Sequence, residues 1–330
     1  MEHLEVKKQI LDKIKEYSSI IIVRHIRPDG DCIGSSLGLR EILRASFPQK
    51  KIYSVGKTEA DYLAFVGKED EALSEEIYKE SLIIVVDTAT SDRIDDDFYK
   101  LGKEIIKIDH HLPVEDYGVI NYVRKDFPAA SCIIVDLYDT FKDELVLPES
   151  AAFALYTGIT TDTGRFRYRG VGSRVFELCS ILMKYDLDLE KIYANLYLKS
   201  ADLLKLQGLV YKSFKTTKNG VSYIHITQKM MKKNGLTYEE AASLVNCLDS
   251  IKGNLIWMIF VDQADKSIRV RIRSRFVEVV EIGRAFRGGG HPNACGATVF
   301  NKKEIKALVE MADGILKEYK ENNEGWLWEF

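Results

Sequence analysis

Histidines and acids gather directly after apolar runs in the amino-terminal half of the chain. The run 105–108 is apolar at three of its four positions and is followed by Asp109, His110 and His111. Such a run predicts a buried strand, so these side chains fall at its carboxyl end, where open α/β sheets bind their ligands. Carboxylate oxygens and imidazole nitrogens are donors that Mn²⁺, Fe²⁺ or Zn²⁺ accept. The cluster therefore predicts a metal site.

A capping acid beside two partly exposed histidines would explain this tripeptide equally well, and the other acids decide between the two interpretations. Three of the six histidines of the chain lie in clusters of this kind. The run 19–24 leads into His25, Asp29 and Asp31, the run 81–86 leads into Asp87, and the segment 156–161 leads into Asp162. That concentration favours one shared site over chance.

The order of these clusters resembles the DHH phosphoesterase superfamily: His-x-x-x-Asp-x-Asp, then Asp, then Asp-His-His, then Thr-Asp-Thr-Gly. In the second half, the segment 286–296 (Phe-Arg-Gly-Gly-Gly-His-Pro-Asn-Ala-Cys-Gly) is similar to the glycine-rich signature of the DHH-associated domain. Both domains match in order, so the resemblance covers nearly the whole chain. The subgroup nearest in length is that of nano-RNases and pAp phosphatases.

The resemblance implies two divalent metal ions that share an activated hydroxide in line with phosphorus. It assigns His25 and Asp29 to one ion and Asp31, His110 and Asp162 to the other, with Asp87 bridging. Asp29 and Asp31 are two residues apart, so in a tight turn they can address different ions, with Gly30 supplying backbone freedom. One histidine per ion among oxygen ligands favours Mn²⁺, although Zn²⁺ or Co²⁺ could compete.

Asp87, Asp109 and His111 are the predicted catalytic residues. Adjacent residues leaving a strand point to opposite sides, so His111 is expected outside the ligand set, contacting the phosphate or orienting a ligand. Asp109 is then expected to hold a histidine in its metal-binding tautomer, with a plain turn acid as the alternative.

The second half of the chain carries a candidate phosphate clamp. Along 267–273, isoleucine and valine alternate with arginine, which predicts a strand whose arginines lie on one face; a solvated edge with acidic partners is the alternative. The glycine triplet that follows removes three β-carbons and lets backbone N–H groups approach an anion. The predicted substrate-binding residues are Arg273, Ser274, Gly288, Gly289, Gly290 and His291.

Composition limits the substrate and the compartment. The net charge of −3 gives no global basic field for long nucleic acids, so the substrate should be short or held by a local basic patch. The five cysteines lack any C-x-x-C pair, which indicates reduced thiols. No apolar run approaches the ~20 residues of a membrane span, and the cytoplasm is the expected location.

The fold class follows from the alternation of strands and helices. The 330 residues suit two α/β domains. We predict a catalytic parallel-sheet domain over 1–190, a helical connector over 191–212, and a smaller DHH-associated domain with a mixed sheet over 213–330, with the active-site cleft between the domains. A hairpin is predicted from strands 210–217 and 221–227 around Lys218-Asn219-Gly220. The aromatic tail 325–330 is expected to pack on its own domain.

The resemblance implies a Mn²⁺-dependent phosphoesterase that hydrolyses short oligonucleotides, linear dinucleotides or the 3′-phosphate of pAp. A cyclic-di-AMP or pApA phosphodiesterase of the same family is the alternative, and the motifs do not separate them. A manganese pyrophosphatase would share the metal motifs with a different carboxy-terminal signature. A nucleotide-binding module without catalysis is the third hypothesis. A homodimer is possible.

Overall fold

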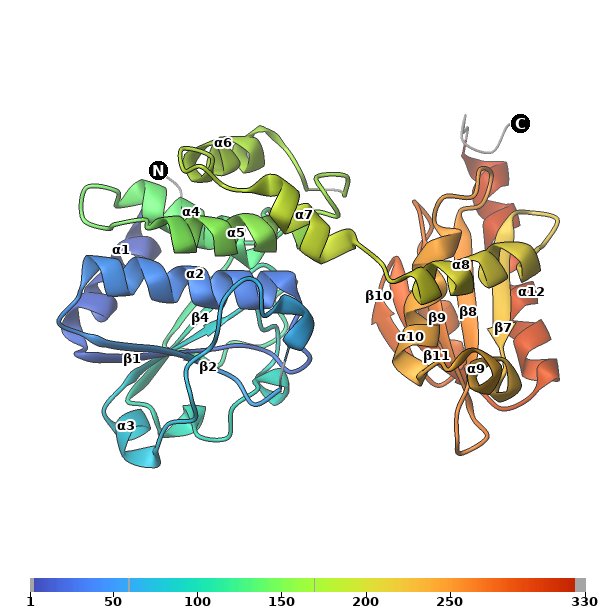
Figure 1. The fold of residues 1–330 in the computed structure, drawn as a ribbon, viewed down its shortest axis with the longest axis horizontal. Coiled ribbons are helices and arrows are strands. Elements are labelled where there is room, and N and C mark those ends of the chain that lie inside the picture. The colour runs from blue at the N-terminus through green and yellow to red at the C-terminus, as the bar shows by residue number, and fades with distance from the viewer. Residues whose placement is uncertain (1–2, 59, 169, 324–330) are drawn as a thin grey trace. The chain divides into compact units, whose positions relative to one another are not determined.

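The computed structural model describes residues 3–58, 60–168 and 170–323, and the chain forms two compact units, Met1–Leu198 and Lys199–Phe330. We call them the amino-terminal and carboxy-terminal units (Figure 1). Within the described ranges, no helix is both long and apolar enough to cross a membrane. The predicted contact of the tail 325–330 lies outside the described residues.

The amino-terminal unit is built on a five-stranded sheet in the order β2-β1-β3-β4-β5, and every pair is parallel. Its strands are β1 (Ser19–Val23), β2 (Lys51–Val55), β3 (Leu82–Val86), β4 (Glu104–Asp109) and β5 (Ile120–Val123). Strands β1 and β3 are buried at every position, because helices cover both faces of a parallel sheet. The predicted α/β class is confirmed.

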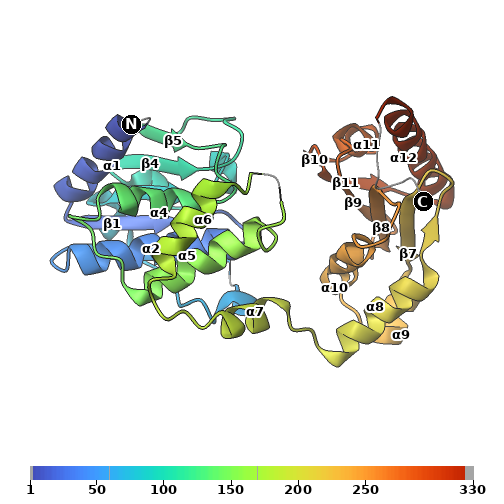
Figure 2. The ribbon, with the colours of Figure 1, turned by 90° about the horizontal axis from the view of Figure 1, so that it is seen from above.

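The two faces of this sheet are covered by different sets of helices (Figures 1 and 2). One face packs against most of the helices, and the other packs against the short α3 and neighbouring 3₁₀ turns. The helices are α1 (Leu4–Glu16), α2 (Gly30–Ser46), α3 (Glu75–Lys79), α4 (Ala130–Thr140), α5 (Glu149–Asp162), α6 (Ser173–Leu182) and α7 (Leu189–Tyr197), with 3₁₀ turns η1 (Asp61–Leu63), η2 (Ser91–Arg93) and η3 (Tyr99–Leu101).

Helices α2 and α5 pack at a crossing where only glycine fits. A β-carbon on Gly34 would lie 2.5 Å from the carbonyl oxygen of Ala154 and 2.9 Å from the Cα of Gly158. A β-carbon on Gly30 would lie 2.4 Å from the Thr161 side chain. This close approach brings the start of α2 beside the end of α5, although the two helices are far apart in the sequence.

The carboxy-terminal unit has a six-stranded mixed sheet in the order β10-β11-β9-β8-β7-β6, in which β7 and β8 are parallel and the other pairs antiparallel. Its elements are α8 (Ala201–Ser213), β6 (Lys215–Thr216), β7 (Val221–Ile226), α9 (Gln228–Asn234), α10 (Tyr238–Ser243), η4 (Leu244–Leu248), β8 (Ile256–Asp262), β9 (Ile268–Ser274), α11 (Val280–Ala285), β10 (Gly289–His291), β11 (Ala294–Val299) and α12 (Lys302–Asn322).

Strand β9 has the predicted alternation. Its three apolar residues are buried in the core that α12 shares, while its arginines lie on the other face, exposed or half-buried. The arginines pair in register with Trp257, Ile259 and Val261 of β8. These β8 side chains belong to the second core of the unit, which includes residues of α8 and α10.

The predicted strand 210–217 is wrong over its first four residues. Helix α8 continues to Ser213, and β6 is only two residues long. The helix persists because Leu206 and Val210 are one turn apart and both are buried in the second core. The predicted connector 191–212 comprises most of α7, a break and most of α8; Ile192 of α7 is buried in the amino-terminal core.

The α2–α5 crossing makes a testable prediction. Gly34→Ala should lower the free energy of unfolding by roughly 1–3 kcal/mol, because the new methyl group overpacks the contact. Gly208→Ala in α8 is the control: a β-carbon there meets nothing within 4 Å, and the change should stabilise by about 0.5–1 kcal/mol. Urea denaturation followed by circular dichroism measures both. Equal stability of the Gly34 variant and the wild type would contradict the tight crossing.

Candidate metal centre

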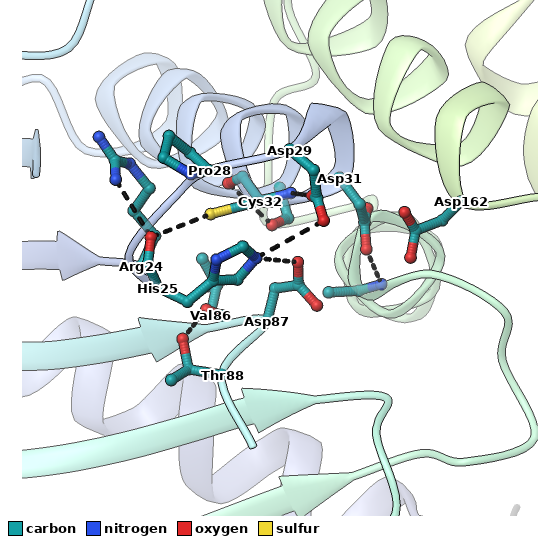
Figure 3. Close-up of polar contacts among 12 residues, drawn as sticks. Arg24, His25, Pro28, Asp29, Asp31, Cys32, Val86, Asp87, Thr88 and Asp162 are labelled. Atoms are coloured by element: carbon teal, nitrogen blue, oxygen red, sulfur yellow. Dashed lines mark hydrogen bonds and ion pairs between the residues drawn. The ribbon is translucent and has the colours of Figure 1, made fainter. Parts of the chain in front are cut away.

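The predicted metal ligands meet at one edge of the parallel sheet. Asp87 directly follows β3, His110 directly follows β4, and His25 lies just beyond β1. Parallel strands end at the same edge, so these three side chains converge. The glycine-mediated crossing adds acids from the start of α2 and the end of α5 (Figure 3).

Asp87 lies between two histidines and offers one oxygen to each. Its Oδ2 is 3.4 Å from His25 Nε2, and its Oδ1 is 3.2 Å from His110 Nε2. The residue is 1% exposed, and its backbone has a φ of 51°, a left-handed conformation that aspartate tolerates better than most residues. This is the arrangement of a carboxylate that could bridge two ions.

Asp29 completes the group on the His25 side. Its side chain caps α2 through Oδ1, which accepts a hydrogen bond from the Cys32 backbone N–H, and its Oδ2 lies 3.7 Å from His25 Nε2. His25 Nδ1 lies 2.8 Å from the backbone carbonyl oxygen of Ile26. Donation to that carbonyl leaves Nε2 as the nitrogen that can bind a metal.

Asp31, His110 and Asp162 form the second group, with donor atoms all within 4.8 Å of one another. His110 Nε2 lies 3.4 Å from Asp162 Oδ2 and 3.9 Å from Asp31 Oδ2. Asp31 is completely buried and accepts backbone hydrogen bonds from Ala130 and Ser131 at the start of α4. Figure 3 shows Asp162 reaching the same point from the end of α5. The structure thus brings all six predicted ligands together.

The electrostatics of the cluster indicate a need for added positive charge. Burial and the nearby charge of Asp87 raise the pKa of Asp31 to about 7, and burial also raises the pKa of Asp162 and of Asp29. Burial opposes ionisation of Asp87 as well, yet the two histidines that face its oxygens hold its pKa well below the usual range. Burial disfavours the charged form of His110, but Asp87 raises its pKa to about 10.

Two buried atoms at the centre have no hydrogen-bond partner within the described residues: Asp87 Oδ1 and His110 Nε2. Unpartnered buried polar atoms are rare in proteins and call for an ion, a water molecule or a function. Together with the crowded carboxylates, they fit divalent cations, which bind deprotonated carboxylates and neutral imidazoles.

Cys32 lies among the donors although the sequence analysis did not select it. Its Sγ is grouped with His25 and Asp87 within 4.8 Å, and the thiol donates a hydrogen bond to the His25 carbonyl oxygen at 3.9 Å. Burial raises the pKa of the thiol well above its ordinary value. A metal ligand must be a thiolate, so the geometry favours a contact that supports His25.

Asp109 contacts the ring of His111, the histidine that was expected outside the ligand set, and the expected position of His111 on the opposite side from His110 is wrong. Asp109 Oδ1 lies 2.8 Å from His111 Nδ1 and also accepts the His110 backbone N–H. The two histidine rings lie side by side, with centroids 4.5 Å apart, and His111 Nδ1 is 3.6 Å from Asp87 Oδ1. Strand β4 ends at Asp109, so strand alternation does not continue through the histidines.

Comparison with known proteins places this site in a family. Residues 19–159 match the family model described as DHH family, N-terminal domain, and residues 220–318 match the DHHA1 domain. The probable bifunctional oligoribonuclease and PAP phosphatase NrnA of Streptococcus mutans is 39% identical over 94% of this chain and 99% of its own length. The chain belongs to the DHH family of phosphoesterases.

Further relatives match both domains of the DHH protein. The bifunctional oligoribonuclease and PAP phosphatase NrnA of Bacillus subtilis is 34% identical, over 96% of this chain and 100% of its own. A solved structure of an exopolyphosphatase-related protein from Bacteroides fragilis is 26% identical and superposes with a TM-score of 0.84 over 96% of each chain. The fold of the DHH protein is thus shared across the full length.

The predicted substrate-binding residues gather at one end of the DHHA1 sheet. His291 of β10 and Arg273 of β9 both pair with Ala294 of β11, which places them on the same face of the sheet. Ser274 donates a hydrogen bond to the carbonyl oxygen of Val277. Close packing requires two of the three glycines: a β-carbon on Gly288 would lie 2.0 Å from the Gly296 carbonyl oxygen, and one on Gly290 would lie 2.7 Å from the Ala294 carbonyl oxygen. A β-carbon on Gly289 would meet nothing within 4 Å.

Two buried cations support the DHH site and were missed as functional residues. Lys107 is completely buried in β4; it donates to the carbonyl oxygens of Ala89 at 2.8 Å and Glu115 at 2.9 Å, and lies 3.5 Å from Asp109 Oδ2. It therefore ties the loop after β3 to the loop after β4. The signal was present, since Lys107 interrupts an apolar strand two residues before Asp109.

Arg24 is the second buried cation and supports His25. It is completely buried, binds Glu69 and Asp95, and donates to the His25 carbonyl oxygen at 3.2 Å (Figure 3). Gly56 makes room for it, because a β-carbon there would lie 2.3 Å from the guanidinium. A fully paired buried arginine fixes the backbone of the first ligand.

The Lys107 contacts predict a measurable loss of stability. Lys107→Met should lower the free energy of unfolding by about 3–5 kcal/mol, because it leaves the buried Asp109 carboxylate without its cation. The double variant Lys107→Met with Asp109→Asn should recover part of that loss, since neither charge is then buried. Lys103→Met, at an exposed position just before β4, is the control. If Lys107→Met is as stable in urea as Lys103→Met, then Lys107 does not neutralise the buried charge of Asp109.

Proposed function

We propose that this DHH phosphoesterase hydrolyses short oligoribonucleotides and the 3′-phosphate of pAp with two divalent metal ions, most simply Mn²⁺. The observation that carries the proposal is the buried Asp87 carboxylate, whose two oxygens face His25 on one side and His110 on the other. The names of the relatives at 39% and 34% identity support the substrates. The free, buried cysteines suit action in the reducing cytoplasm.

The metal positions follow from the two groups of donors. His25 and Asp29 would hold one ion. The other ion would be held by Asp31, His110 and Asp162, and Asp87 would contact both ions. Two ions held together supply an activated water molecule and neutralise charge that develops on the phosphoryl oxygens. Arg24 and Lys107 keep the ligands in place during the reaction, because each buried cation fixes the backbone or carboxylate next to a ligand.

His111 is the best candidate for a direct contact with the reacting phosphate. The contact with Asp109 occupies Nδ1, so we assign Nε2 to the substrate. When protonated, Nε2 can donate a hydrogen bond to a phosphoryl oxygen, or a proton to the leaving oxygen as the P–O bond breaks. Asp109 would stabilise the positive charge of His111 while both ring nitrogens are protonated, before Nε2 gives up its proton. In the DHHA1 domain, we assign Arg273, Ser274 and the segment Gly288–His291 to substrate binding.

Three other activities use the same donors. A cyclic-dinucleotide phosphodiesterase would differ only in substrate selection. A manganese pyrophosphatase is disfavoured by the DHHA1 match over residues 220–318. A binding module without catalysis is disfavoured because every predicted metal ligand lies in the cluster.

A substrate panel tests the proposal. With Mn²⁺ present, the protein should hydrolyse pAp, pApA, pGpG and a five-nucleotide RNA, and act more slowly on cyclic di-AMP, a long single strand and pyrophosphate. Removal of metal by a chelator should abolish every activity, and added Mn²⁺ should restore it. Preferred turnover of pyrophosphate would contradict the proposal, and activity that survives chelation would contradict the metal mechanism.

The bridging position of Asp87 predicts a graded effect of mutation. Asp87→Asn should lower kcat by more than the roughly 10–100-fold typical of losing an outer-shell contact, because one substitution weakens both metal positions. Asp29→Asn, which weakens only one metal position, should lower kcat less. Asp143→Asn, exposed in the loop between α4 and α5, is the charge-matched control. Metal content should be measured alongside kcat; equal losses for Asp87 and Asp29 would argue against a bridge.

A further inference from the structure

Two arginines beside the metal centre have no partner in the part of the chain that the structure describes. Most arginine side chains there bind an acid, a carbonyl oxygen or an aromatic ring. The guanidinium groups of Arg27 and Arg93 make no such contact in these described ranges, although Arg93 is half-buried. Unpaired guanidinium groups beside a phosphoesterase site are candidates for binding an anion.

The fold places these two arginines next to each other and next to His25. The backbone N–H of Ile26 donates to the Arg93 carbonyl oxygen at 2.8 Å, and His25 pairs with Ile94 in an isolated antiparallel bridge. Arg27 lies between His25 and Asp29, and two residues of chain span at most about 7 Å. The backbone of both arginines therefore lies beside the segment that carries His25 and Asp29.

Arg27 is also held in a backbone conformation that its sequence context disfavours. Its φ is 56°, in the left-handed region that side chains other than glycine and asparagine rarely adopt. It precedes Pro28, and a residue before proline is pushed towards extended conformations. Strained residues of this kind persist where the surrounding structure determines them and cluster at ligand sites.

An aromatic ring lies at the same corner. The Tyr62 hydroxyl donates to the Pro28 carbonyl oxygen at 2.7 Å, while the residue is 65% exposed. The hydrogen bond fixes the ring beside the loop that carries Arg27 and Asp29. An exposed ring held in this way offers a face on which a nucleobase can stack.

Charge balance explains why a nucleotide needs these groups. The acids assigned as metal ligands, Asp29, Asp31, Asp87 and Asp162, would cancel the charge of two divalent ions. A substrate with a second phosphate brings further negative charge that the metal centre cannot balance. Side-chain cations at its margin are needed for it.

We propose that Arg27, Arg93 and Tyr62 form a nucleotide subsite in the DHH domain. The two arginines bind the phosphate next to the scissile one, and Tyr62 stacks on the base of that nucleotide. The inference rests on the proposed function, because it names the part of the substrate that this corner of the same site recognises. Arg27 and Arg93 are specificity residues for substrates with a second phosphate.

The test compares two substrates that differ by one phosphate: adenosine 3′,5′-bisphosphate and adenosine 3′-monophosphate. In the full-length, Mn²⁺-loaded protein, Arg27→Gln and Arg93→Gln should each raise the KM for the bisphosphate about tenfold, the size of a charge-assisted contact. The kcat and the KM for the monophosphate should stay within twofold. Lys184→Gln, which removes an exposed charge of the same domain elsewhere, should change neither substrate.

Two more variants separate recognition from structure. Arg27→Gly removes the guanidinium and relieves the left-handed strain, so it should raise the KM for the bisphosphate while the melting temperature stays equal to or above that of the wild type. Tyr62→Leu should raise the KM for pApA. It should not change the KM for an analogue of pApA whose 5′ nucleotide lacks its base. A loss of melting temperature in Arg27→Gly would assign Arg27 a structural role instead.

Other outcomes overturn the subsite or the proposed function separately. Equal changes for the bisphosphate and the monophosphate, or no change for either, would overturn the arginine subsite. If the wild type hydrolyses neither nucleotide but still cleaves bis-p-nitrophenyl phosphate, the proposed function fails and the subsite is tested by inhibition. Adenosine 3′,5′-bisphosphate should then inhibit that cleavage more strongly than the monophosphate, and the difference should vanish in Arg27→Gln; persistence of the difference would refute the subsite.

Discussion

The rest of the amino-terminal unit depends on the interaction of the Asp87 carboxylate with His25 and His110. A buried ionised carboxylate is unfavourable unless opposite charges and hydrogen bonds surround it. Here two histidines approach its two oxygens at 3.4 and 3.2 Å, and these histidines follow different strands. The parallel sheet, the glycine crossing and the caps at α2 and α4 all hold groups around this one side chain.

The supporting charges are paired beneath the site. Arg24 pairs with Glu69 and Asp95 from other segments of the chain, whereas Lys107 pairs with Asp109 on the same strand, β4. Such pairs are weak contributors to net stability but fix geometry, because breaking either one leaves a buried charge. Arg24 and Lys107 are thus paired cations next to ligand residues, whereas Arg27 and Arg93 are the arginines that we propose for the substrate.

The candidate metal ligands and the substrate-binding residues predicted from the sequence lie in different domains. The DHH domain contains all of the acids and histidines of the metal centre, and the DHHA1 domain contributes the arginine strand and the glycine-rich segment. Gly288 and Gly290 have a packing reason, since a β-carbon on either would meet the backbone of β11. Close packing and anion binding are compatible, because both use the absence of a side chain.

The sequence by itself determined the fold class and indicated the acids and histidines that are candidate metal ligands. Apolar runs ending in acids or histidines are visible without coordinates, because a parallel sheet needs the runs and its carboxyl edge needs the donors. The strand alternation at Arg269, Arg271 and Arg273 was equally clear. What these patterns have in common is that each lies within a short stretch of chain.

Only the tertiary structure decided the features that join distant segments. The length of α8 depended on packing of Leu206 and Val210 in a core formed by β7 and β8. The orientation of His111 depended on where β4 ends, and the partner of Lys107 on the loops after β3 and β4. That Arg27 and Arg93 have no side-chain partner among the described residues could not be predicted, because local sequence does not tell which acids from elsewhere in the fold will reach a given cation.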